Sequence, residues 1–410
     1  MKTLFTSFLS LLMFSMSLKA QTSWIQKSDF PGGERYETYH FTIGDTGYIA
    51  CGITGGGVYF NDLHGYVAST DSWFEATPLP AEERYAGLSF SIGNKGYVVS
   101  GDKPFSLGFS EVWEYDGITD SWTQKGDFPG VERSNATSFV LKGEGYVLFG
   151  LDDSYDYLND VWKYKPATDE WVQLNDFPGD ARVQAFSFVL YDTAYVMGGF
   201  NSSDGRYDQM WMYHAVDDSW EMIDELPGGG MQGSSAFTLD NRGYYAGGFN
   251  DAYIYSTEVY EYEPLSNTWT QKEDFPSDAR TGTAVFVIDT NAYISTGLMP
   301  GYTAISETWQ FDNGFSDTTG SSDTTIIDDT TTALLNLARE SLVVFPNPVK
   351  SCLNINSVEV YSFTQTVMIK NSNGTLVKEM FFDEILDVTF LPPGFYILQV
   401  NESFAYFIKL

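Results

Sequence analysis

Five arginines recur through most of the chain at intervals of 49 residues, with one gap in the series at Met231. Guanidinium groups bind carboxylates and phosphates through paired hydrogen bonds, so a ring of arginines could form an anion-binding site. Three of the five directly follow a glutamate, which leaves a second role open: bracing neighbouring structure through carbonyl and carboxylate groups. The five arginines are Arg35, Arg84, Arg133, Arg182 and Arg280.

Aromatic residues, mostly tyrosine, recur in short segments that otherwise differ from one another, such as "ITGGGVYFN", "LDDSYDYLN" and "FNDAYIYST". Variable segments on a rigid scaffold usually carry recognition. Tyrosine combines a rigid apolar ring with a polar tip, which suits contact with sugars or peptides. We therefore expect ligand-binding residues at Tyr59, Phe105, Tyr155, Tyr157, Tyr207, Tyr253, Tyr255 and Tyr302.

Signals for catalysis are few. The three histidines, His40, His64 and His214, fall at three different positions of the repeat, and no metal-ligand spacing is present. The acidic stretch 152–160 lacks the spacing of an EF-hand. The sequence thus identifies no catalytic residue, no metal site and no cofactor, and it leaves enzymatic activity open.

The elements that must position these residues also follow the 49-residue interval. All ten tryptophans fall at two positions of the repeat, and phenylalanine, tyrosine, glycine and proline each recur at a further position. A period near 50 built from short strands and turn residues predicts the blades of a β-propeller. The longest tryptophan series is Trp24, Trp73, Trp122, Trp171, Trp220 and Trp269.

Each unit reads as four strands, which in the first unit lie near residues 39–43, 48–51 and 63–67 and around Trp73. The repeats begin at a fourth strand near Trp24 and end at a third strand near Trp309. The N-terminal strand is therefore expected to complete the last blade and close a six-bladed, all-β ring. Alternating strand direction places the arginines and the variable segments on one face, with the arginines at the mouth of the central channel.

The repeat resembles the kelch motif over residues 24–311. It has an arginine, an apolar strand, a Gly-Tyr strand that ends in glycine, then "EVWEY" or "DVWKY" and a second tryptophan. Kelch repeats usually carry a glycine pair, which only Gly198-Gly199 and Gly247-Gly248 keep here. The resemblance implies a propeller, and kelch domains that recognise acidic peptides place arginines at this mouth. The copper-radical oxidase built on this scaffold needs a cross-linked cysteine and histidine ligands, which nothing here matches.

The formal net charge of −33 argues against a nucleic-acid partner, because phosphate backbones would be repelled. Residues 1–20 read as a signal peptide, with Lys2, an apolar stretch and Ala20 before the expected cut. No membrane span is expected in the mature chain. Two cysteines, Cys51 and Cys352, exclude a disulfide framework.

Four segments follow: the signal peptide 1–20, the propeller 21–315, a Ser/Thr/Asp-rich linker 316–340 and a C-terminal domain 341–410. The last contains "VVFPNPVKSCLNI", "LPPGFYILQV" and "FIKL", in this order, and resembles the type A C-terminal sorting domain of the type IX secretion system. Its short strands suit a small β-sandwich. The resemblance implies that the secretion machinery is a partner and that the protein is secreted or attached to the outer cell surface.

Two functions remain. The first is a non-catalytic binding module for a glycan or protein ligand on the loop-bearing face. The alternative is a carbohydrate-active enzyme resembling the kelch-type sialic-acid mutarotases, with arginine and glutamate at the channel mouth as acid and base. A deep mouth pocket holding a carboxyl of raised pKa beside Arg84 or Arg133 would favour the enzyme. A shallow aromatic surface would favour the binding module.

Overall fold

A computed structural model describes residues 23–103 and 108–312, together with strands and one single residue between positions 343 and 409. The predicted signal peptide, the linker and Phe105 lie outside the described residues. In the described part the chain is almost entirely β-structure, and the one helical segment is the short 3₁₀ turn η1 (Ala68–Thr70). No helix in this part is long and apolar enough to cross a membrane.

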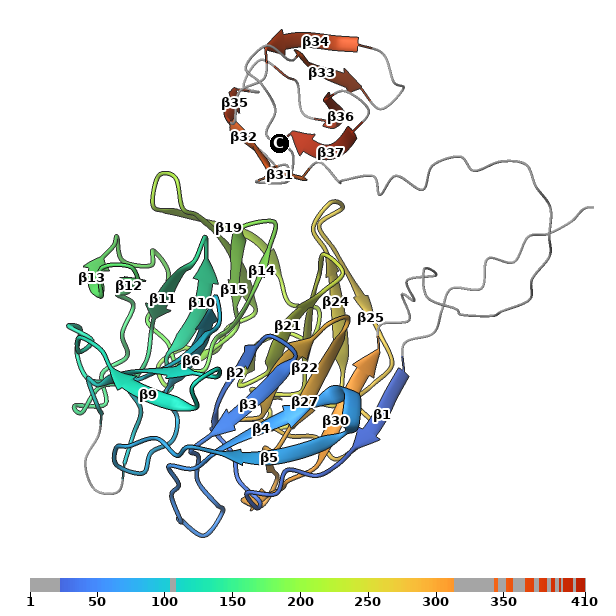
Figure 1. Cartoon of the computed structure of the whole chain (residues 1–410). Helices are drawn as coiled ribbons and strands as arrows, with labels where there is room; N and C mark the ends of the chain where they lie inside the picture. Colours follow the sequence, from blue (N-terminus) through green and yellow to red (C-terminus); the bar gives the residue numbers. More distant parts are fainter. Residues whose placement is uncertain are drawn as a thin grey trace, which may run out of the picture.

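Six four-stranded antiparallel sheets form the blades of a propeller, as the sequence repeat predicted (Figure 1). The innermost strands contact one another in a closed ring, from β2 through β6, β10, β14, β21 and β26 back to β2.

Blade 1 contains β2 (Tyr39–Ile43), β3 (Thr46–Ala50), β4 (Leu63–Val67) and β5 (Ser72–Ala76). Blade 2 contains β6 (Leu88–Ile92), β7 (Lys95–Val99), β8 (Val112–Asp116) and β9 (Ser121–Gln124). Blade 3 contains β10 (Thr137–Leu141), β11 (Glu144–Leu148), β12 (Val161–Lys165) and β13 (Glu170–Gln173). Blade 4 contains β14 (Phe186–Leu190), β15 (Thr193–Met197), β18 (Gln209–His214) and β19 (Ser219–Glu225). Blade 5 contains β21 (Ser235–Leu239), β22 (Arg242–Ala246), β24 (Val259–Glu263) and β25 (Thr268–Gln271).

Blade 6 is assembled from both ends of the propeller sequence. Its inner strands are β26 (Ala284–Ile288), β27 (Asn291–Ser295) and β30 (Thr308–Asp312), and its outer strand is β1 (Ser23–Lys27). Trp24 pairs with Phe311 across this seam, and Figure 1 shows β1 beside β30. The predicted closure is confirmed. It removes two open sheet edges, which would otherwise expose unpaired backbone groups.

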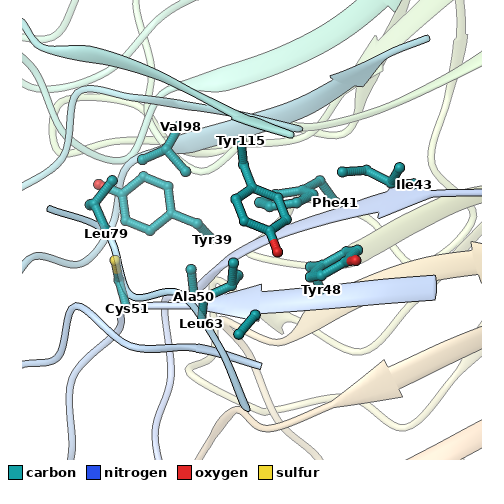
Figure 2. Packing of buried hydrophobic residues seen from close by; sticks show 11 residues of the cluster. Tyr39, Phe41, Ile43, Tyr48, Ala50, Cys51, Leu63, Leu79, Val98 and Tyr115 are labelled. Carbon is teal, nitrogen blue, oxygen red and sulfur yellow. The ribbon is translucent and has the colours of Figure 1, made fainter. Parts of the chain in front are cut away.

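Aromatic rings fill the space between neighbouring blades. In blade 1, Phe41 stacks on Tyr48, and both rings meet Tyr115 from the third strand of blade 2, at centroid distances of 6.1 and 5.4 Å (Figure 2). Gly96 lies against the Phe41 ring so closely that a β-carbon there would come within 2.3 Å of it. The glycine of the repeated Gly-Tyr pair thus makes room for the preceding blade. The aromatic residues in register with Tyr115 are Tyr66, Tyr164, Tyr213, Tyr262 and Phe311.

The loop face is the face that carries the connections between the second and third strands and the connections between blades. Short strand pairs add a further layer of backbone hydrogen bonds there. These strands are β16 (Phe200–Asn201), β17 (Gly205–Arg206), β20 (Met231–Gln232), β23 (Phe249–Asn250), β28 (Leu298–Met299) and β29 (Thr303–Ala304). The variable segments are therefore anchored to the blades at their bases.

The C-terminal region forms two further antiparallel sheets, in agreement with the predicted small β-domain. The first sheet contains β31 (Val343–Phe345), β32 (Cys352–Asn356) and β35 (Ile385–Asp387). The second contains β33 (Thr366–Asn371), β34 (Leu376–Phe381), β36 (Gly394–Val400) and β37 (Ser403–Lys409). Within the second sheet, the side chains of Ile369 and Leu398 are fully buried.

Candidate functional site

The five repeated arginines lie in the wall of the propeller, where their side chains are almost completely buried. Arg133, for example, is 1% exposed and forms two parallel hydrogen bonds with the Asp160 carboxylate, of 2.6 and 2.8 Å. Its other donors bond to the carbonyls of Val131 and Phe149. The guanidinium group is thereby held inside the fold. This geometry matches the bracing role.

Each arginine meets a residue 27 positions further along the chain, at the start of the third strand of its own blade. In four blades this partner is acidic, whereas Arg182 bonds to the Gln209 amide at 3.2 Å. Burial lowers the pKa of Arg182 to about 10. Blade 5 keeps the acidic residue but lacks the arginine, because Glu258 occupies the acidic position and Met231 occupies that of the arginine. The acidic partners are Asp62 for Arg35, Glu111 for Arg84, Asp160 for Arg133 and Glu307 for Arg280.

Three of the predicted loop tyrosines project from the loop face. Tyr155, Tyr253 and Tyr302 are 69%, 73% and 78% exposed, and all three adopt the left-handed backbone conformation, with φ between 58° and 62°. They occupy the same position of the repeat in blades 3, 5 and 6, where blade 1 has Gly57. A bulky residue with positive φ is strained, and such strain tends to gather at functional sites.

The other predicted tyrosines lie deeper. Three of them are partly buried within the connections between the second and third strands: Tyr59, Tyr157 and Tyr255. Tyr207 is only 8% exposed, and its ring packs on the Arg182 guanidinium with 3.8 Å between centroid and Cζ. Tyr207 is thus part of the wall, and its ring is not available as an open contact surface.

Some of these tyrosines converge around Tyr36, which lies three residues before β2, the inner strand of blade 1. Burial raises the pKa of Tyr36 to about 12, with contributions from Glu37 and from the hydroxyls of Tyr59, Tyr302 and Tyr255. Tyr59 also packs edge-on against Tyr85 at 5.4 Å between ring centroids. The tyrosines of blades 1, 2, 5 and 6 therefore share one region of the loop face. Tyr157 contacts Phe200 instead, on the side of blades 3 and 4.

The channel mouth is a ring of six equivalent residues, one from each blade, all in the left-handed conformation. Backbone hydrogen bonds run from one to the next, for example from Ala86 N–H to the Glu37 carbonyl at 3.0 Å and from Glu37 N–H to the Gly282 carbonyl at 2.8 Å. These bonds fix the width of the opening. The six residues are Glu37, Ala86, Asn135, Gln184, Gly233 and Gly282.

One carboxyl and three amides face one another at this mouth. The Gln184 amide donates to Glu37 Oε1 at 3.2 Å and to Asn135 Oδ1 at 3.0 Å, and it accepts from the Gln232 amide. Burial raises the pKa of Glu37 to about 7, aided by the negative charge of Asp102 and opposed by the bond from Gln184. Glu37 therefore changes charge near neutral pH, which an exposed glutamate does not do.

Asp102 lies at the outer side of the mouth. It is 6% exposed and accepts hydrogen bonds from the Tyr85 hydroxyl at 3.1 Å and from Lys103 N–H at 2.7 Å. Burial nevertheless raises its pKa above the usual value. Two carboxyl groups with raised pKa thus lie on the same part of the loop face, and Tyr85 lies beside one of them.

Three cavities adjoin these residues. The mouth itself encloses about 170 Å³, and the channel below it encloses about 730 Å³ between the inner strands, lined mainly by serine, threonine and small apolar side chains. His40 lines both, and burial lowers its pKa to about 4. A cleft of about 540 Å³ between Glu34, Gly55 and Tyr302 opens on the loop face. Within the described ranges, no group of three or more His, Cys, Asp and Glu residues is arranged to hold a metal ion.

Glu37 was not among the residues predicted from the sequence. The arginines and tryptophans stood out because they repeat, whereas Glu37 is the only acidic residue at its position of the repeat, among Ala86, Asn135, Gln184 and two glycines. A usable signal was nevertheless present, because an acidic residue two positions before an innermost strand must lie near the channel mouth.

Comparisons with known proteins agree with this architecture. Residues 132–178 match the kelch motif, and residues 343–409 match the secretion system C-terminal sorting domain. A solved structure, "Structure of YjhT", shares the fold, with a TM-score of 0.60 and 17% sequence identity over 69% of this chain and 95% of that chain. No curated protein matches the chain significantly.

The sorting domain indicates export through the type IX secretion system, to the cell surface or into the surroundings. The chain therefore combines two recognisable parts. One is a six-bladed β-propeller that contains a kelch motif at residues 132–178, and the other is a secretion system C-terminal sorting domain at residues 343–409.

Proposed function

We propose that the propeller is a non-catalytic binding module that takes a glycan or protein ligand on its loop face. The observation that carries this proposal is the group of strained, exposed tyrosines on that face. Tyr155, Tyr253 and Tyr302 each hold a large ring in solvent on a backbone that favours glycine. Without a ligand, neither the exposure nor the strain contributes to stability.

The support beneath these rings suits recognition. Hydrogen bonds between segments fix the loop bases, for example from Tyr36 N–H to the Ile53 carbonyl at 3.0 Å and from Asn250 N–H to the Ile254 carbonyl at 3.1 Å. A ligand then meets a surface that is already ordered, so that little conformational entropy is lost on binding. Tyrosine rings at the rim and a polar mouth at the centre resemble the general layout of a binding site, with apolar area and a few placed polar groups.

The buried arginines supply no open anion-binding ring. Each is bonded to carbonyl groups, side-chain acceptors or both inside the wall. The mouth carries the carboxyl groups of Glu37 and, at its outer side, Asp102, and its other polar groups are amides, hydroxyls and the neutral His40. We therefore expect a neutral or cationic ligand.

The enzymatic alternative keeps one supporting observation. Glu37 has a pKa of about 7, which suits proton transfer at neutral pH. However, an acid–base pair of arginine and glutamate would require an arginine close to Glu37. None of the five buried arginines is among the groups that shift the pKa of Glu37. A sialic acid also carries a carboxylate, which the acidic mouth would repel. Acceleration of the anomer exchange of a neutral reducing sugar by the protein, lost in Glu37→Gln, would support this alternative.

The proposed function is tested by applying the full-length exported protein to glycan and peptide arrays. Hits are then measured again with the double variant Tyr253→Ala/Tyr302→Ala. The control is Ile118→Ala, which removes an 80% exposed apolar side chain from a turn on the opposite face. We expect the double variant to weaken binding at least tenfold and the control to leave it unchanged. Equal binding by all three proteins would contradict a site on the loop face.

A further inference from the structure

The channel mouth has polar groups that the fold leaves unpaired. Thr38, which lines the mouth cavity, is 7% exposed, and its hydroxyl has no partner. Gln232 is 6% exposed, and its side-chain oxygen has no partner, although its amide nitrogen bonds to Gln184. Buried polar groups are normally satisfied, so each of these calls for an explanation. A carbonyl oxygen can be satisfied only by a donor.

The charge at the mouth is also uncompensated. Glu37 and Asp102 repel each other, and neither forms an ion pair within the described part of the chain. Cations on the same face are already bound elsewhere, because Lys103 Nζ lies 3.0 Å from Glu82 and Arg206 lies 3.4 Å from Asp251. The site therefore combines unfilled acceptors, negative charge and an incomplete set of partners.

We propose that the channel mouth binds a primary ammonium group, presented as a lysine side chain of a protein partner. This inference rests on the binding function proposed above and names the group that is recognised. An ammonium group has three donors and no acceptor, which complements the Glu37 carboxylate and the Thr38 hydroxyl that line the mouth cavity. The unpaired oxygen of Gln232, whose amide nitrogen bonds to Gln184 there, is a further acceptor. The rings of Tyr36, Tyr59 and Tyr85 beside the mouth offer apolar area for the methylene stem and π-faces for the charge.

The ring of backbone hydrogen bonds around the mouth favours lysine over an amino sugar. A cavity of about 170 Å³ inside a hydrogen-bonded ring accepts an unbranched stem with a compact head. An amino sugar carries its amine directly on a six-membered ring, which would itself have to enter the opening. A lysine places its ammonium group four carbons away from the partner's backbone, which can then lie across the tyrosines.

The test uses the full-length protein and small probes observed by saturation-transfer NMR. The probes are Nα-acetyl-lysine methylamide, the same compound acetylated on Nε, and an oligomer of glucosamine. We expect binding of the first, and at least tenfold weaker binding of the other two. Nε-acetylation changes only the probe, so this comparison is informative even if a protein variant is unstable.

Two variants locate the site. Glu37→Gln should weaken lysine binding at least tenfold, whereas Glu83→Gln should not change it. The control removes one negative charge from the same face at an exposed side chain outside the mouth and leaves the Lys103–Glu82 pair intact. Binding should also strengthen between pH 6 and pH 8. Glu37 ionises in that range and lysine stays charged, while His40, which lines the mouth cavity, stays neutral. The other ionisable groups near Glu37 are Asp102, Tyr36 and Tyr85.

Equal binding of the free and the acetylated lysine, or an unchanged affinity in Glu37→Gln, would overturn the inference. Binding of the glucosamine oligomer without binding of lysine would overturn the choice of a protein partner. In either case, array hits that depend on Tyr253 and Tyr302 would leave the proposed binding function standing. Hits that do not depend on these tyrosines would contradict that function instead.

Discussion

Arg133 and Asp160 are joined by two parallel hydrogen bonds, although they come from different segments of blade 3: the connection that leads into the blade and the start of its third strand. The pair ties the loop face to the sheet below it. Burial alone would raise the pKa of Asp160, but the bonds and charge of Arg133, together with a hydrogen bond from Trp162, outweigh it and hold the pKa below its usual range.

Replacing Arg133 with methionine, the residue that blade 5 has at this position, should destabilise the propeller by about 3 kcal/mol. The reason is that Asp160 loses its partner while its carboxylate remains largely buried. Urea unfolding followed by circular dichroism measures the effect. The double variant Arg133→Met/Asp160→Asn should lose less, because asparagine leaves no charge unpaired. A single variant within about 0.5 kcal/mol of wild type would contradict a bracing role.

The same pairs predict the response to acid. The pKa values of Asp62, Asp160 and Glu307 are all held below their usual ranges in the folded protein, because the hydrogen bonds and charges of their partners together outweigh burial. These partners are the arginines, with His64 at Asp62, Trp162 at Asp160, and Ser277 and Trp309 at Glu307. Their contribution to stability is therefore complete above the unfolded-state pKa of about 4 and is lost as the pH falls below it. We expect the unfolding free energy to fall steeply below about pH 5. Asp160→Asn should make this fall shallower, and an unchanged slope would count against the pair.

The seam should matter to the whole ring. A chain that starts at Ser28 lacks β1, and with it the Trp24 ring, which packs on Phe275 and Phe311 at 4.9 and 4.8 Å. The backbone of β30 would then be an open edge. We expect a single unfolding transition at a clearly lower temperature in differential scanning calorimetry, because all six blades depend on closure. Unchanged thermal stability, or loss of one blade only, would contradict this expectation.

Glu37 predicts an opposite pH effect. Because its folded-state pKa of about 7 lies above the unfolded value, the protonated carboxyl is favoured in the folded protein. Stability should therefore decrease as the pH rises from about 4 to 7 and then level off. The difference in stability between Glu37→Gln and wild type, measured by thermal unfolding, should therefore be more favourable to the variant at pH 8 than at pH 5. Glu83→Gln, the surface control, should show no such difference.

The exposed tyrosines should separate binding from stability. Tyr302→Gly removes the backbone strain at φ 61° but gives the unfolded chain more freedom, so the unfolding free energy should stay within about 0.5 kcal/mol of wild type. Affinity for an array hit should nevertheless fall. Thermal unfolding and binding measured on the same preparation make the comparison. A large loss of stability would show that Tyr302 packs against the fold and is not held for a ligand.

Most of the architecture could be predicted from the sequence, because each blade repeats the same contacts. The phase of the repeat also predicted the seam, since Trp24 occupies the position of an outer strand and Trp309 that of a third strand. The role of the arginines was harder to predict. Their position before the inner strands is correct, but their side chains turn into the wall. The acidic residues at a constant distance of 27 positions, from Asp62 to Glu307, would have indicated this.

The mouth was less predictable for a physical reason. The altered pKa of Glu37 depends on burial by five other blades and on Asp102, which belongs to the next blade, and neither leaves a pattern in the sequence around Glu37. The tyrosines were predicted as a set, yet only the structure separates exposed rings such as Tyr302 from a packed one such as Tyr207.

The junction of Ser23–Lys27 with Thr308–Asp312 has a consequence for synthesis and export. The strand β1 is synthesised first, whereas its pairing partner β30 is synthesised only at the end of the propeller sequence. A shortened product therefore leaves blade 6 incomplete and keeps its backbone edges available to chaperones and proteases. Only a chain synthesised through to Asp312 can form the closed ring.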